Sequence, residues 1–118
     1  MQSVTSNAVA QKLSSLSDVF YIGGVTGFDY DQFTSFRFSN VCVLSGRITG
    51  TNIGNGTVFM NLPSGYRPKK YLYVNGVCES SSAKYPCVFG ISDGGGINVY
   101  HNGSGVNGLF ISVAFETN

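Results

Sequence analysis

The pattern of apolar positions changes near residue 18, and this change divides the chain into two predicted segments. From Thr5 to Leu16 there is no glycine or proline, and several of the residues favour a helix. Apolar side chains recur at spacings of four, three and four, at Val9, Leu13, Leu16 and Phe20. This spacing is the a/d rhythm of a coiled-coil seam. Residues 1–18 are therefore predicted to form a short N-terminal helix that serves as an oligomerisation segment.

A helix of about three turns is only marginally stable by itself in water, so its apolar stripe has to be buried against something. One possibility is that the stripe packs on the β domain of the same chain. The other is that it packs on copies of itself in a trimeric coiled coil, which the a/d spacing favours.

The remainder, residues 19–118, is predicted to be a single β domain. Short apolar or alternating segments follow one another, at 19–22, 34–38, 41–48, 57–62, 71–78, 87–91, 97–100 and 109–115. Most are separated by Asn-Gly, Asp-Gly or glycine-rich steps, which supply the positive φ angles of tight hairpins. This pattern predicts an antiparallel β-sandwich with a jelly-roll-like arrangement. Gly46, inside a predicted strand, indicates a bulge or a close neighbour.

The charge content excludes several classes of function. Charged residues make up 11% of the chain, seven basic and six acidic, without the basic stripe of a nucleic-acid-binding protein. No apolar run approaches the roughly 18 residues that would cross a bilayer, so membrane insertion is not expected. The three cysteines lack C-x-x-C spacing and the chain has one histidine, so no zinc-binding motif is recognised and neither a metal nor a cofactor is expected. Cys42, Cys78 and Cys87 are predicted to be buried, and whether Cys78 pairs with Cys87 stays open.

Catalytic signatures are also missing from the sequence. The chain has no G-x-S-x-G motif, and its one histidine, His101, is interpreted as a surface residue at a strand end. Asp29 and Asp31 are interpreted as solvated loop residues, and Asp93, followed by three glycines, as part of a hairpin turn. The chain is therefore predicted not to be an enzyme.

A binding surface is the remaining source of function. Tyrosine and asparagine side chains in the predicted loops can offer ring faces and amide groups to a sugar. The candidate saccharide-binding residues are Tyr85, Tyr100, His101, Asn102 and Asn107. Asp93 and His101 are expected at opposite ends of the sheet, and the His101 end, distal to the N-terminal helix, is the predicted site.

Two motifs resemble those of phage tail fibre and baseplate proteins. Residues 3–13 are similar to the S-V-T-S-x-A-V lead-in to a helix in such proteins. Residues 56–68 contain a turn similar to L-P-x-G-Y-R-P in their C-terminal receptor-binding heads. Within this turn, Pro63 and Pro68 flank Gly65, and Tyr66 is predicted to pack on the core instead of contacting a ligand.

The resemblance implies a homotrimeric receptor-binding head that recognises a host cell-surface polysaccharide. It also implies contacts with other tail or baseplate proteins and a place in the virion tail after assembly in the host cytoplasm. Two other functions stay open. One is a structural tail-fibre knob or assembly adaptor without a ligand, and the other is a cell-wall polysaccharide depolymerase.

Overall fold

The computed structural model describes residues 18–19, 23–81 and 83–117. The predicted N-terminal helix, with its seam residues Val9, Leu13, Leu16 and Phe20, lies outside these residues. The helix, its oligomerisation and the boundary after residue 18 therefore stay predictions.

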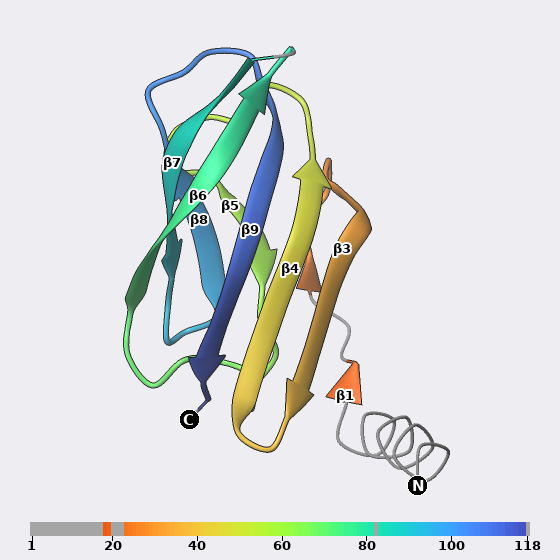
Figure 1. The fold of residues 1–118 in the computed structure, drawn as a ribbon, viewed down its shortest axis with the longest axis vertical. Helices are drawn as coiled ribbons and strands as arrows, with labels where there is room; N and C mark the ends of the chain where they lie inside the picture. The colour runs from red at the N-terminus through yellow and green to blue at the C-terminus, as the bar shows by residue number, and fades with distance from the viewer. Residues whose placement is uncertain (1–17, 20–22, 82, 118) are drawn as a thin grey trace, which may run out of the picture.

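In the described residues, nine antiparallel strands form one sheet (Figure 1). In chain order they are β1 Asp18–Val19, β2 Gly23–Gly24, β3 Asp29–Phe38, β4 Val41–Thr49, β5 Val58–Asn61, β6 Leu72–Ser80, β7 Ala83–Ile91, β8 Gly96–Tyr100 and β9 Val106–Glu116. Their order across the sheet is β1-β3-β4-β9-β6-β7-β8-β5-β2. The predicted class, a mainly β antiparallel head, is confirmed. The sheet is continuous, and its curl produces the layered arrangement.

The curl places β3, β4, β9 and β6 in one wall and β8 and β5 in the facing wall (Figure 1). Alternate residues of both walls point inward and form a core that includes Leu44 on β4, Phe59 on β5 and Val99 on β8. Tyr30 on β3 donates a hydrogen bond to the carbonyl of Phe59 on β5, which joins the two walls. The two walls of the curled sheet thus enclose the core, and β4, β7, β8 and β9 contribute most of its buried side chains along their length.

Gly46 allows β3 and β4 to approach closely. Its φ is +136°, and a Cβ at this position would lie 2.1 Å from the carbonyl oxygen of Gln32. The pairing of β3 with β4 shifts register between Asp29 and Gln32, as it does at a bulge. The close neighbour predicted for Gly46 is confirmed.

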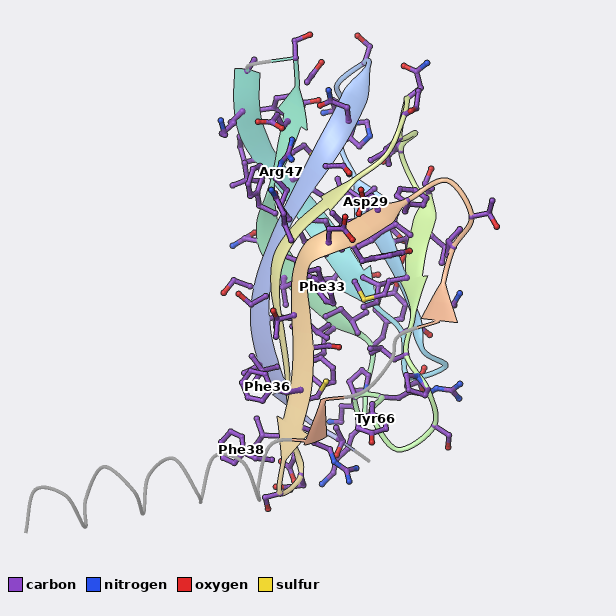
Figure 2. All side chains as sticks on the ribbon, turned by 90° about the vertical axis from the view of Figure 1, so that its right-hand side faces the viewer. Asp29, Phe33, Phe36, Phe38, Arg47 and Tyr66 are labelled. Atoms are coloured by element: carbon purple, nitrogen blue, oxygen red, sulfur yellow. The ribbon has the colours of Figure 1, made fainter. Side chains whose placement is uncertain are left out.

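The Pro63–Pro68 turn packs onto the core as predicted. The amide of Tyr66 donates to the carbonyl of Pro63 at 3.1 Å, and Gly65 has a φ of +91°. The Tyr66 ring packs against the core, with the Arg37 guanidinium 4.7 Å from its centroid. Figure 2 shows Tyr66 on the opposite side of β3 from the outward-pointing Phe36 and Phe38.

All three cysteines are buried and unpaired, which confirms the prediction of burial. Cys78 and Cys87 lie on neighbouring strands, where Cys78 pairs with Tyr85 and Cys87 pairs with Gly76. They are therefore diagonal neighbours. Desolvation by burial raises the pKa of both thiols, and it raises the pKa of Cys42 to about 12.

Candidate functional site

The candidate site lies where β8 ends and β7 continues without it. The pairing of β7 with β8 ends at Val88 and Tyr100. The segment 83–87 of β7 then pairs only with β6 among the described strands. The chain leaving β8 at residues 101–103 lies beside this segment and forms one side of a groove. The site is at the end of the sheet away from β1 and the C-terminal end of β9 (Figure 1).

Asp93 lies at the other end of β8, as the sequence predicted. The amide of Gly95 donates to the carbonyl of Ser92 at 2.9 Å, and Gly95 has a φ of +104°. The predicted hairpin turn at residues 93–96 is thus confirmed. Asp93 and His101 therefore belong to different ends of the sheet.

The groove has a volume of about 750 Å³ and is open to solvent. Its lining includes four of the five predicted binding residues, namely Tyr85, Tyr100, His101 and Asn102. Asn55 and Asn75 also line it. No Asp, Glu, Lys or Arg is among its lining residues. The fifth, Asn107, is exposed on β9 outside the groove, where its carbonyl accepts a hydrogen bond from Gly50 at 3.1 Å.

His101 is buried, so the interpretation as a surface residue was wrong. Its side chain is 8% exposed, and its Nδ1 accepts a hydrogen bond from the Gly103 amide at 3.0 Å. Because Nδ1 is an acceptor, Nε2 carries the proton of the neutral ring and donates to the Ile53 carbonyl at 2.8 Å. The ring thus ties the β4–β5 loop to the segment after β8, and both nitrogens are already used.

A second bond strengthens this connection. The Asn55 side-chain oxygen accepts a hydrogen bond from the His101 amide at 3.0 Å. Sequence patterns did not assign Asn55 to this site, since it lies 46 residues from His101 and only the fold brings them together.

Tyr85 differs from His101 in that its buried polar group, the hydroxyl, forms no hydrogen bond to the described residues. It packs against Gly103, where a Cβ would come within 1.8 Å of the hydroxyl oxygen. Desolvation is the largest cause of the raised pKa of Tyr85. An unpaired buried hydroxyl costs about 1–3 kcal/mol, and any hydrogen-bond partner that reached it would remove this cost.

Beside the groove, Tyr71, just before β6, and two residues of β8 form a hydrogen-bond network that sequence patterns did not indicate. Asn98 Nδ2 donates to the Tyr100 hydroxyl at 2.9 Å, and the Tyr71 hydroxyl donates to Asn98 Oδ1 at 3.2 Å. The Tyr71 and Tyr100 hydroxyls are 3.4 Å apart, and this contact is the largest cause of the raised pKa of Tyr71. Strand alternation could have indicated these residues, because Asn98 and Tyr100 share one face of β8. Tyr71 likewise lies on the same side of the chain as Tyr73 and Asn75 of β6.

Asp29 and Asp31 form a separate and much smaller feature. They line a cavity of about 170 Å³ with Arg47 and Thr49, and the Asp31 amide donates to Asp29 Oδ1 at 2.9 Å. Both aspartates belong to β3, so their interpretation as loop residues was wrong.

Within the described ranges, no three His, Cys, Asp or Glu side chains are placed to hold a metal ion. No helix in the same ranges has the length and apolarity needed to span a membrane.

The curled nine-stranded sheet has the fold of phage receptor-binding head domains. The head domain of lactococcal phage bIL170 matches it with a TM-score of 0.67 at 14% identity, over 86% of this chain and 99% of that one. The receptor-binding protein of Listeria phage PSA matches with a TM-score of 0.64 at 22% identity, over 99% of this chain and 77% of that one. No protein-family model and no curated protein matches the sequence. The resemblance carried by the two motifs is confirmed as a likeness of fold.

Proposed function

We propose that this chain is a receptor-binding head of a phage tail and that it binds a host cell-surface saccharide in the groove beside Tyr85 and Asn102. The observation that carries the proposal is an uncharged groove, rich in tyrosine and asparagine, on a fold shared with phage receptor-binding heads. It lies at the end of the sheet opposite β1, where a host surface is accessible if the tail attaches through the N-terminus.

The chemistry of the groove suits a neutral sugar. Tyrosine rings can pack on the apolar face of a sugar ring, and the Asn55, Asn75 and Asn102 amides offer both donors and acceptors to hydroxyl groups. The unpaired Tyr85 hydroxyl gains a partner when a sugar hydroxyl enters. The proposed role is binding without catalysis, because the groove lining has no carboxylate for glycoside hydrolysis and both nitrogens of His101 are held by backbone groups.

We also propose that the head works as a homotrimer attached to other tail or baseplate proteins. The support is the Val9, Leu13, Leu16 and Phe20 seam in the sequence. Three linked sites raise the apparent affinity for a repetitive surface even when each site is weak. Light scattering at micromolar concentration should give a trimer mass, and Leu13→Asp should reduce it to a monomer mass. A monomer mass for the unchanged chain would contradict the trimer.

The test of binding is an array of bacterial surface polysaccharides that includes those of Lactococcus and Listeria strains. The chain should bind at least one polysaccharide, and Asn102→Ala should weaken that binding without changing the melting temperature. Asn107→Ala is the matched control, since it removes an exposed amide outside the groove. An adaptor without a ligand would bind none of the polysaccharides. A depolymerase would release reducing ends from the bound polysaccharide during incubation.

A further inference from the structure

We infer that the receptor is an extended sugar chain, because a platform of three tyrosines next to the groove forms a second sugar subsite. The platform consists of Tyr71, Tyr73 and Tyr100. This inference rests on the proposed function and adds to it that at least two adjacent sugar units are bound, one in the groove and one on the platform.

The platform is open to solvent and consists of aromatic rings. Tyr73 is 69% exposed and Tyr71 is 40% exposed, the first being the most exposed of the large hydrophobic side chains in the described residues. The two ring centroids are 4.9 Å apart, with planes inclined at 41°. Exposed neighbouring rings on a strand face bury little of their own surface, so the surface they offer is available to a ligand.

The backbone beneath the platform is shaped to accept it. Tyr71 precedes β6, yet its hydroxyl reaches across β7 to Asn98 on β8. It passes over Gly90, where a Cβ would lie 2.5 Å from the Tyr71 hydroxyl and 3.1 Å from Asn98 Oδ1. Gly90 has no positive φ that would require glycine. Glycine at position 90 therefore leaves the room in which the Tyr71 side chain crosses β7.

Hydrogen bonds hold the rings in place before any ligand arrives. The Asn98 amide bonds to both Tyr71 and Tyr100, and the two hydroxyls are also within 3.4 Å of each other. A surface whose rings are already ordered loses less conformational entropy on binding.

Tyr100 connects the platform to the groove. It lines the groove together with Asn75 and Val88, and it belongs to the hydrogen-bond network of the platform. Neither region contributes a charged side chain, so a neutral ligand with both apolar faces and hydroxyl groups fits the two surfaces together. A sugar chain running from the groove over Tyr100 onto Tyr71 and Tyr73 meets this description.

The test compares polysaccharide fragments of different length. The probe is the polysaccharide that the unchanged chain binds on the array, cut by partial acid hydrolysis and separated by size. Tyr73→Ala should weaken binding of fragments with several sugar units by about tenfold, in the range expected for a lost aromatic contact. It should leave the affinity for the shortest bound fragment unchanged. Tyr73→Phe, which keeps the ring, should retain most of the affinity.

Gly90→Ala provides an independent test that removes no tyrosine. The added methyl displaces the outer end of the exposed Tyr71 side chain, so the platform is disturbed while the chain still folds. Affinity for long fragments should fall, and Gly94→Ala, in the turn at the other end of β8, should not change it.

Each result separates the two proposals. If the unchanged chain binds no polysaccharide, the proposed function fails and this inference fails with it. If the chain binds but Tyr73→Ala and Gly90→Ala leave the affinity for every fragment length unchanged, only the inference is overturned. A changed oligomer mass for Tyr73→Ala, with affinity unaffected, would identify the platform as a contact between copies and would also overturn it.

Discussion

The Gly103 amide donates a hydrogen bond to His101 Nδ1, and this bond determines what the imidazole can do. It leaves Nε2 as the protonated nitrogen, which donates to the carbonyl of Ile53. His101 therefore fixes the shape of the groove, and its neighbour Asn102 is left to contact a ligand.

Substitution at these two adjacent positions should separate stability from binding. His101→Ala leaves the Ile53 carbonyl and the Gly103 amide without their partner, so the free energy of unfolding should fall by about 1–3 kcal/mol. Asn102→Ala removes an exposed side chain and should change it by less than about 0.5 kcal/mol. Urea unfolding measures both. An unchanged midpoint for His101→Ala would contradict the structural role assigned to the ring.

Tyr85→Phe should affect binding without destabilising the fold. The substitution removes a buried hydroxyl that has no partner in the described residues, so the unliganded protein should be as stable as before or slightly more stable. Affinity for the bound polysaccharide should fall several-fold because the ligand loses about one hydrogen bond. Calorimetric unfolding and the polysaccharide array give the two values. A clear loss of stability would show that the hydroxyl already has a partner in the folded protein.

Tyr66→Ala should be a stability variant. The ring packs on the core and under the Arg37 guanidinium, so its removal should lower the free energy of unfolding by about 2–3 kcal/mol, less than for a fully buried ring. Tyr73→Ala, which removes a ring that is mostly exposed, is the matched control and should leave the melting temperature nearly unchanged. An unchanged melting temperature combined with lost binding for Tyr66→Ala would make this turn part of the binding site.

The ion pairs of Glu79 should make the free energy of unfolding depend on pH in the acidic range. The hydrogen bond from Arg47 is the largest cause that lowers the pKa of Glu79, and Lys84 adds to it at 3.3 Å. A carboxyl group whose pKa is lowered on folding stabilises the protein fully above its ordinary pKa of about 4.5. This stabilisation is lost as the pH falls through the lower pKa of the folded state.

Glu79→Gln should therefore flatten the acidic part of the stability profile. Melting temperatures between about pH 2 and pH 6 should decline less steeply for the variant than for the unchanged chain. Glu116→Gln is the control, because its partner Lys69 is more than half exposed and the pair is screened by solvent. If Glu79→Gln reproduces the profile of the unchanged chain, the Arg47 pair does not contribute to stability.

The strands and turns were determined largely by the local sequence. The β-prone apolar run from Val41 to Leu44 and the glycine-rich step after Asp93 favour a strand and a hairpin turn, because β propensity and φ preferences act within a few residues. The same local rules placed Tyr66 on the core and separated the Asp93 and His101 ends of β8. The motifs at residues 3–13 and 56–68 indicated the head fold for the same reason. Each is a short local pattern, a lead-in to a helix and a turn, that can be recognised without knowing which residues meet in the fold.

Tertiary structure alone decided which of these residues meet. The burial of His101 depends on Ile53 and Asn55, which lie 48 and 46 residues away in the chain. The reach of Tyr71 over Gly90 to Asn98 depends on three neighbouring segments being hydrogen-bonded side by side. Local preferences carry no information on such pairs, because the distance between them is set by strand order and by the curl of the sheet. Sequence therefore determined the strands and the chemical types at one end of β8, and packing determined which side chains hold the groove and which are free to bind.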